Sequence, residues 1–195
     1  MFSILSYVRI GVNLARRVKI CHYAVMKVIF FVAMTVNGKI AHAHDELVDW
    51  TSVEDKKFFN EETKKCGVVV MGHSTHKTIG RPLPGRLNVV MTRTPDVSKN
   101  QEGALKFTDA GPETLIRDLE TRGFHTIAVI GGAQIFTQFL EAGLCNELAI
   151  TIEPKIFGRG VNLFNDMSRD FSLELLETRA LNPHVVLLRY HVIKS

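Results

Sequence analysis

The chain has 195 residues, of which 46% are hydrophobic and 23% are charged, and its mean hydropathy is +0.08. This composition is that of a globular protein and excludes collagen, coiled coils and intrinsic disorder, while the length predicts a single domain. The 3 cysteines form no CxxC or CxxH group, so we expect a reducing compartment, the cytoplasm, without disulfides or structural zinc.

The positive charge of the chain is concentrated in residues 1–25. Four of the 24 Lys and Arg lie there with no Asp or Glu, which leaves 20 cations against 20 anions in the remainder. The net charge of +4 therefore does not predict binding to nucleic acid. Residues 1–25 lack a membrane-spanning apolar run and the charge order of a secretory signal. We interpret them as a dispensable extension before a domain at 26–195, or as an amphipathic targeting helix without stable membrane insertion.

From residue 26 onward, apolar runs alternate with segments of helical period, which predicts an α/β fold. The last two strands follow each other around Asn182 and Pro183, so we expect an antiparallel hairpin at the edge of a mixed sheet. In chain order, the predicted elements are strand 27–34, helix 53–65, strand 67–71, helix 74–79, strand 87–92, helix 112–121, strand 126–130, helix 133–142, and strands 147–153, 171–178 and 184–193.

The helix predicted at 53–65 carries an acid beside two aromatic residues. Asp55, Phe58 and Phe59 lie at i, i+3 and i+4, and therefore on one helix face. Asp55 also fits the third helical position after an N-cap at Ser52, where the helix dipole favours an acid. The other interpretation is a partly desolvated carboxylate of raised pKa that binds a cationic or amidine-like group. The two interpretations are compatible.

Two of the predicted strands end in glycine turns that lead directly into helices. The sequence GHST at 72–75 follows one strand, and GGAQ at 131–134 follows another. Bare glycines let a ligand approach the backbone, and free N–H groups at a helix start suit phosphate oxygens. Neither turn is a GxGxxG or Walker motif, and tight helix–strand packing would explain either turn alone. With TRT at 92–94 on a third strand end, they indicate a site for a phosphorylated dinucleotide.

Two loops carry further candidate residues. In the loop IGRPLPGR at 79–86, two prolines stiffen the chain, so Arg86 can clamp a carboxylate bidentately, or it can form a solvated surface pair with Arg81. The loop at 42–45 contains His42, His44 and Asp45 in an HxHD pattern. Because two histidines and an acid in a flexible loop are more often solvated than ligating, we expect no metal there.

Taken together, these features resemble dihydrofolate reductase over nearly all of residues 27–192. The likeness is carried by Trp50 followed by Asp55, Phe58 and Phe59, and by the runs VVVMGHSTHKTIGRPLPGRLNVVMTR, VIGGAQIF and ELAITIE. The resemblance implies a mixed, mostly parallel eight-strand sheet with an antiparallel C-terminal edge, flanked by about four helices. It also implies reduction of 7,8-dihydrofolate to tetrahydrofolate, with NADPH as the cofactor.

The resemblance assigns a role to each matching residue. Asp55 would pair with the 2-amino group and N3 of the pterin, Thr151 would hydrogen-bond near it, and Trp50 would hold a water. Arg86 would bind the glutamate α-carboxylate, and residues 40–49 would form a mobile loop over the nicotinamide. The paired glycines would be joined by a cis peptide. The implied walls of the substrate site are Phe31, Val32, Phe58, Phe59, Leu83, Ile130 and Phe136; the implied NADPH contacts are Ala33, Ile40, Gly72, His73, Ser74, Thr75, Thr92, Arg93, Thr94, Gly131, Gly132, Ala133, Gln134 and Ile135.

Some positions leave alternatives open. His73 and Ala133 stand where the family commonly has a basic residue and a third glycine, so a preference for NADPH over NADH does not follow from the resemblance alone. The run EPKIFGRGVNLF at 153–164 is more similar to the reductase domain of riboflavin biosynthesis, whose substrate is a ribosylaminopyrimidine phosphate. A non-catalytic nucleotide-binding module is a third interpretation. In each case we expect a small-molecule ligand and a monomer or homodimer.

Overall fold

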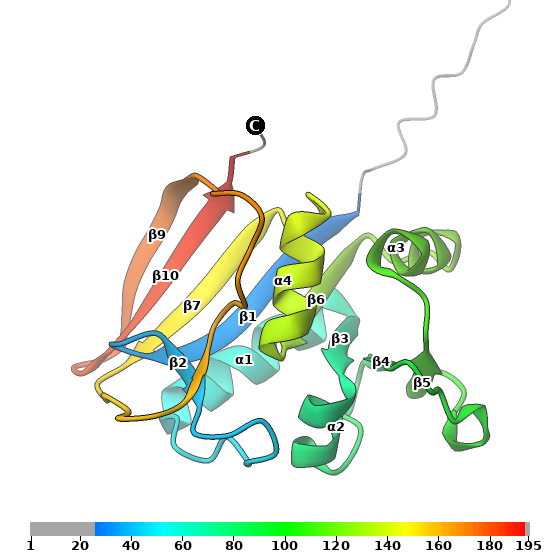
Figure 1. The fold of residues 1–195 in the computed structure, drawn as a ribbon, viewed down its shortest axis with the longest axis horizontal. Coiled ribbons are helices and arrows are strands. Elements are labelled where there is room, and N and C mark those ends of the chain that lie inside the picture. Colours follow the sequence, from blue (N-terminus) through cyan, green and yellow to red (C-terminus); the bar gives the residue numbers. More distant parts are fainter. Residues whose placement is uncertain (1–25, 194–195) are drawn as a thin grey trace, which may run out of the picture.

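The computed structural model describes residues 26–193, and the interpretations of residues 1–25 lie outside that range. Within it, eight strands form one sheet, shown as arrows in Figure 1. Their order across the sheet is β5 (Leu105–Thr108), β4 (Leu87–Met91), β3 (Val68–Gly72), β6 (Thr126–Gly131), β1 (Lys27–Thr35), β7 (Glu147–Glu153), β10 (Val185–Val192) and β9 (Leu173–Asn182).

The sheet is mixed, as the sequence predicts. Strands β1, β3, β4, β5, β6 and β7 pair in parallel with their neighbours among these six. Strand β10 runs antiparallel to both β7 and β9, and the β9–β10 hairpin turns at Pro183 and His184. The predicted hairpin is therefore confirmed, and β9 is an edge strand of the sheet.

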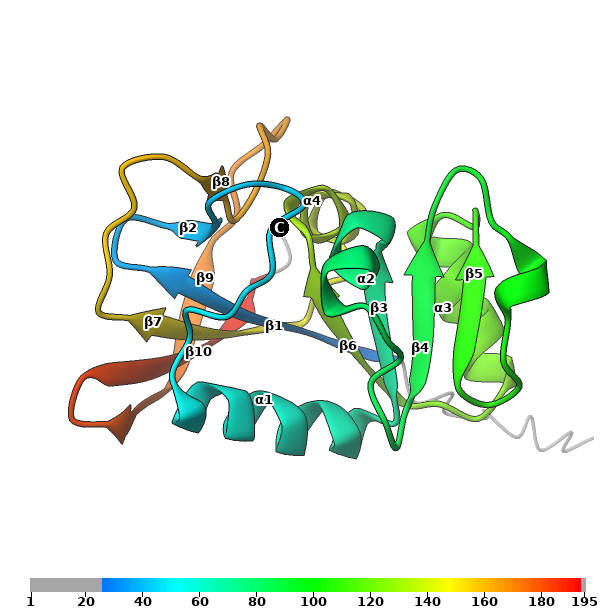
Figure 2. The same cartoon turned by 90° about the horizontal axis from the view of Figure 1, so that it is seen from below.

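Helices cover both faces of the sheet (Figure 2). They are α1 (Val53–Cys66), α2 (His73–Ile79), α3 (Pro112–Thr121), α4 (Ala133–Glu141) and the short 3-10 helix η1 (Val97–Lys99). Successive side chains of β1 point to opposite faces, so Ile29 and Phe31 pack in the apolar cluster that includes α1. Val28 and Phe30 pack in the other cluster, together with apolar side chains of α3 and α4. This arrangement gives three layers, with the sheet between helices.

Both ends of α1 are capped by the local sequence. The side chain of Ser52 accepts a hydrogen bond from the backbone N–H of Asp55 at 3.2 Å, so the predicted cap is confirmed. A cap of this kind stabilises a helix by about 1 kcal/mol. At the other end, Gly67 adopts a left-handed conformation with φ of 75°, and its N–H donates to the carbonyl of Lys64. The capped helix packs beside β1, β3 and β6.

Three short strands are absent from the sequence-based prediction. Strand β5 has four residues and carries Lys106, so it lacks a continuous apolar run. Strands β2 (Lys39–Ala41) and β8 (Val161–Asn162) pair only with each other, in a separate antiparallel ribbon. The strand predicted at 171–178 is shifted, because β9 begins at Leu173 and extends to the turn before β10. Short strands whose pairing partners are distant in sequence leave little periodic signal.

The ribbon of β2 and β8 depends on a glycine at 160. A Cβ atom at Gly160 would lie 2.5 Å from the backbone oxygen of Ala41, a contact that backbone movement would have to relieve. We expect Gly160→Ala to separate β8 from β2 and to lower the free energy of unfolding by about 1–3 kcal/mol. Gly158→Ala is the matched control, since a Cβ there meets nothing within 4 Å. Equal urea midpoints for the two variants would contradict this expectation.

Over residues 26–193, no helix is both long enough and apolar enough to cross a membrane. The same residues contain no group of three or more His, Cys, Asp or Glu side chains placed to bind a metal ion. Cys66 and Cys145 are buried free thiols, and burial raises the pKa of both, to about 11 for Cys66. These two cysteines are therefore poor nucleophiles in the folded chain.

Candidate active site

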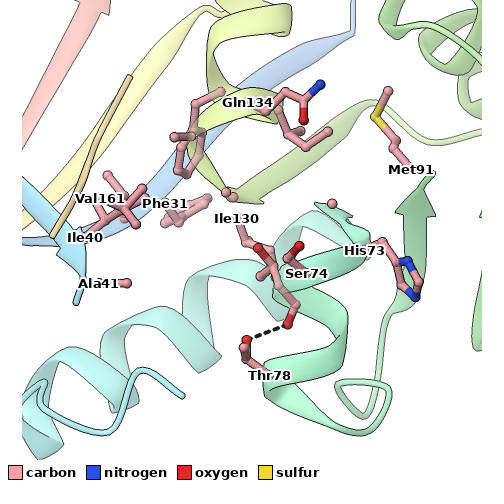
Figure 3. Close-up of a pocket in the computed structure, with 18 of the residues that line it drawn as sticks. Phe31, Ile40, Ala41, His73, Ser74, Thr78, Met91, Ile130, Gln134 and Val161 are labelled. Atoms are coloured by element: carbon pink, nitrogen blue, oxygen red, sulfur yellow. Dashed lines mark hydrogen bonds between the residues drawn. The ribbon is translucent and has the colours of Figure 1, made fainter. Parts of the chain in front are cut away.

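A pocket of about 1180 Å³ opens at the carboxyl ends of the parallel strands. This is the position at which open α/β sheets bind ligands. The close-up in Figure 3 runs from Ile40 at one end, past Ile130, to His73 at the other. Most of the residues that sequence reasoning selects line this pocket: Phe31, Val32, Ala33, Ile40, Asp55, Phe58, Phe59, Gly72, His73, Ser74, Thr75, Leu83, Thr92, Arg93, Ile130, Gly131, Gly132, Ala133, Gln134, Ile135, Phe136 and Thr151.

Three of the selected residues do not line the pocket. Trp50 lies in the segment that leads into α1, and its ring packs against Phe157. Arg86 is buried beneath α1. Thr94 is exposed beyond the end of β4. The roles assigned to these three residues stay predictions.

The carboxyl group of Asp55 is the buried acid of the pocket. It lies on the first turn of α1 and is only 7% exposed. Burial raises its pKa above the ordinary value, although hydrogen bonds from Thr151 and Thr51 oppose this shift. Asp55 therefore occupies the predicted third position of the helix, and its carboxyl group is also desolvated as predicted.

The raised pKa of Asp55 predicts how the stability of the folded chain depends on pH. Between 3.8 and the folded pKa of Asp55, the folded chain holds the proton that the unfolded chain has lost, so stability falls as pH rises. We expect Asp55→Asn to raise the free energy of unfolding at neutral pH, where that cost is fully present. The gain should vanish at a pH below 3.8, where both states are protonated. Urea unfolding of both proteins at the two pH values tests this, and an equal gain at both would contradict it.

A second buried acid, Glu153, was missed by sequence reasoning. It lies at the end of β7, is 2% exposed, and accepts hydrogen bonds from the backbone N–H and the hydroxyl of Ser52, each at 2.8 Å. Its charge contributes to the raised pKa of Asp55. Glu153 ties the start of α1 to β7, which carries Thr151. The sequence signal that could have identified Glu153 is its place as an acid at the end of an apolar strand.

Aromatic and aliphatic side chains form the walls beside Asp55. The rings of Phe31 and Phe58 lie 6.2 Å apart with an angle of 52° between their planes. Phe58, Phe59, Leu83 and Ile130 are partly buried against the apolar cluster under α1, and each also lines the pocket. A flat apolar ring can therefore lie beside a carboxylate in this half of the pocket.

Arg86 connects α1 to the loop before β4. It is 5% exposed, so the alternative of a solvated surface pair with Arg81 is wrong for this residue. Its guanidinium donates to the hydroxyl of Thr63, to the side-chain oxygen of Asn60 at 2.6 Å, and to the carbonyl of Pro84 at 3.2 Å. These three acceptors hold the guanidinium in a fixed orientation.

The glycine turns form the other half of the pocket. Gly72 and Gly132 are the N-caps of α2 and α4, and neither helix start has a side-chain cap. The bond between Gly131 and Gly132 is a cis peptide, as the resemblance implies. A Cβ atom at Gly72 would lie 3.1 Å from Ile135, so the two turns are closely packed. The predicted tight packing is therefore observed, and the role of the helix N–H groups stays a prediction.

The far end of the pocket mixes charges of both signs. His73 and Arg93 lie there, as selected from the sequence, but so do Asp109 and Glu113, which were missed. The two acids belong to the turn between β5 and α3, and β5 itself was not predicted. The position of this turn beside α2 follows from the strand order, which no local pattern reveals.

Comparison with known proteins supplies the family. The sequence profile of dihydrofolate reductase matches residues 27–174. This chain belongs to the dihydrofolate reductase family. Among the most similar relatives is the uncharacterized protein YyaP of Bacillus subtilis, 25% identical over 181 residues that span 85% of this chain and 94% of YyaP.

Two solved structures place the chain within the dihydrofolate reductase fold. Dihydrofolate reductase from Enterococcus faecalis, complexed with NADP(H) and RAB-propyl, is 25% identical with a TM-score of 0.65, over 87% of this chain and 97% of that one. The deaminase/5-amino-6-(5-phosphoribosylamino)uracil reductase of Thermotoga maritima is 19% identical with a TM-score of 0.71, over 85% of this chain and 56% of that one. The second likeness indicates a shared fold and no more.

Proposed function

We propose that this chain catalyses the NADPH-dependent reduction of 7,8-dihydrofolate to tetrahydrofolate. The observation that carries the proposal is the buried carboxyl group of Asp55, which lies beside Phe58 and Phe59 in a pocket shared with two uncapped helix starts. An unneeded carboxylate in such a place would cost several kcal/mol unless it were paired. Thr151 and Thr51 hydrogen-bond this carboxyl group, and a bound heterocycle with N–H donors would add further partners.

Asp55 would orient the pterin. Its two oxygens match the 2-amino group and N3–H of the ring, which form a planar pair of donors like that of an amidine. Thr151 and Thr51 hydrogen-bond the carboxyl group and keep it directed into the pocket. Phe31 and Phe58 would then contact the faces of the ring.

Arg86 would bind the α-carboxylate of the glutamate tail. Three of its five N–H groups are used within the protein, by Thr63, Asn60 and Pro84, which leaves two donors for a carboxylate. Because the guanidinium is already fixed, little side-chain entropy would be lost on binding. Phe59 and Leu83 line the pocket together with Asp55 and would hold the benzoyl group.

The residues in the half of the pocket formed by the glycine turns fit NADPH. The starts of α2 and α4, which have no side-chain caps, suit the two phosphates, and glycine at 131 lets a ligand approach the backbone of the turn. His73 and Arg93 would contact the additional phosphate on the adenosine ribose. When bound there, NADPH supplies the hydride that reduces C6 of the pterin.

The proton for N5 of the pterin would come from water admitted near Trp50. The indole N–H of Trp50 is buried and has no hydrogen-bond partner within residues 26–193, so it can donate to such a water. The negative charge of Asp55 would favour the protonated ring electrostatically. On this proposal no histidine acts as an acid.

The experiment compares two substrates with the purified chain and NADPH. We expect NADPH oxidation with 7,8-dihydrofolate and none with the ribosylaminopyrimidine phosphate of the riboflavin pathway. The aromatic walls beside Asp55 and the fixed guanidinium of Arg86 favour the first substrate. Turnover of the pyrimidine alone would show that the chain is a pyrimidine reductase of the riboflavin pathway instead. Cofactor binding without turnover of either would indicate a nucleotide-binding module.

A further inference from the structure

Glu153 is a buried acid that the proposed reaction does not use. It is the last residue of β7, is 2% exposed, and does not line the pocket. Within residues 26–193, no Lys, Arg or His forms an ion pair with it. A buried carboxyl group without a cation is costly unless hydrogen bonds satisfy it, so the hydrogen bonds of Glu153 show which part of the fold depends on it.

The hydrogen bonds of Glu153 lead through one hydroxyl group to Asp55. The backbone N–H and the hydroxyl of Ser52 both donate to the Oε1 atom of Glu153, each at 2.8 Å. The oxygen of the same hydroxyl accepts from the backbone N–H of Asp55 at 3.2 Å. A hydroxyl has one proton, so donation to Glu153 leaves the lone pairs of Ser52 to accept from Asp55. The three residues therefore form one directed chain of hydrogen bonds.

Strand β7 holds Asp55 at a second point. Thr151 and Glu153 lie two residues apart on β7, so their side chains point to the same face of the sheet. Thr151 hydrogen-bonds the carboxyl group of Asp55, whereas Glu153 holds its backbone through Ser52. Because β7 lies between β1 and β10, both attachments come from inside the sheet. The carboxyl group of Asp55 is thus fixed relative to the sheet by two side chains of one strand.

We propose that Glu153 is a positioning residue for the reaction, which acts through Ser52 to direct the carboxyl group of Asp55 toward the bound ring. The inference rests on the proposed function, because Asp55 is assigned there to the pterin. The charge of Glu153 reaches the same group. Burial is the main cause of the raised pKa of Asp55, the charge of Glu153 on β7 adds to it, and the charge of Lys56 on α1 opposes it.

Three variants test the chain of hydrogen bonds. Glu153→Met keeps the length of the side chain but removes the acceptor, and kcat/KM for dihydrofolate should fall about 10- to 100-fold as Asp55 loses its orientation. Glu153→Gln keeps an oxygen that can accept from Ser52 and should restore most of that loss. Ser52→Ala breaks the chain at its middle and should lower kcat/KM as Glu153→Met does. Glu147→Met is the matched control, since Glu147 is the acid at the other end of β7, does not line the pocket, and should leave kcat/KM near the wild-type value.

The Asp55→Asn background separates positioning of Asp55 from a general loss of packing. If Glu153 acts through Asp55, Glu153→Met should change kcat/KM by less than about twofold in that background, because the two substitutions remove the same interaction. An equal loss in both backgrounds would overturn the proposal. So would unchanged kcat/KM in Glu153→Met and Ser52→Ala, or a loss in Glu153→Gln as large as that in Glu153→Met.

A measurement without substrate distinguishes this proposal from the proposed function. NMR titration of ¹³C-labelled aspartate carboxyl groups follows the pKa of Asp55, whose signal is identified by its absence in Asp55→Asn. Because the charge of Glu153 raises this pKa, Glu153→Gln should lower it, whereas Glu147→Gln should not change it. An unchanged pKa in Glu153→Gln would overturn the proposal. If the wild-type chain does not reduce dihydrofolate, the proposed function fails, whereas this titration still decides whether Glu153 acts on Asp55.

Discussion

Replacing Asp55 by Asn is expected to lower kcat/KM for dihydrofolate about 10²- to 10³-fold, the effect typical of removing one preorganised charge from an active site. The amide keeps the size of the carboxyl group but loses its charge and presents an N–H where the pterin needs an acceptor. Binding of NADPH should change little, because the glycine turns lie in the other half of the pocket. Steady-state kinetics and NADPH titration measure the two quantities.

Glu54→Gln is the control for this result. Glu54 is the neighbouring acid on the first turn of α1, and its carboxylate accepts a hydrogen bond from the half-buried Asn182 at 2.9 Å. It does not line the pocket, so its replacement should leave kcat/KM near the wild-type value. Unchanged turnover in Asp55→Asn, or an equal loss in both variants, would contradict the role assigned to Asp55.

The second large effect is expected at the glycine turn after β6. Gly131→Ala should raise the dissociation constant of NADPH about 100-fold, because relief of a backbone strain of about 1–3 kcal/mol would displace the turn from the position that NADPH needs. Gly131 has φ of +119°, a conformation that side chains other than glycine rarely adopt, and its Cβ would lie 3.4 Å from Phe136. Fluorescence titration with NADPH measures the change.

Gly123→Ala controls for the strain alone. Gly123 also has positive φ, +84°, but a Cβ there meets nothing within 4 Å, and the residue does not line the pocket. We expect it to lose stability while it keeps its NADPH affinity. If Gly131→Ala binds NADPH as tightly as Gly123→Ala does, the glycine turn is not part of the cofactor site.

Most of the fold could be predicted because its long elements carry local signals. The cap at Ser52 and the glycine at 67 set the limits of α1, and the apolar run of β7 was predicted at its observed bounds, Glu147–Glu153. Strands β2 and β8 could not be predicted in this way. Each is held by the other and by the small size of Gly160, and neither feature is visible until distant parts of the chain are brought together.

The same distinction applies to the site. Asp55, Phe58 and Phe59 could be selected because helical spacing places them on one face. Asp109 and Glu113 could not, since their position in the pocket follows from strand order. The contact of Phe157 with Trp50 likewise depends on how two loops fold toward each other, for which sequence periodicity offers no signal.

The most direct measurement follows the hydride itself. A single turnover of the purified chain with 7,8-dihydrofolate and NADPH that carries deuterium at both C4 positions of the nicotinamide should yield tetrahydrofolate that carries deuterium at C6 of the pterin, detected by NMR. Asp55→Asn should form the same labelled product at a much lower rate. Tetrahydrofolate without the label, or no product from the wild-type chain while NADPH is bound, would contradict the assignment of this pocket to dihydrofolate reduction.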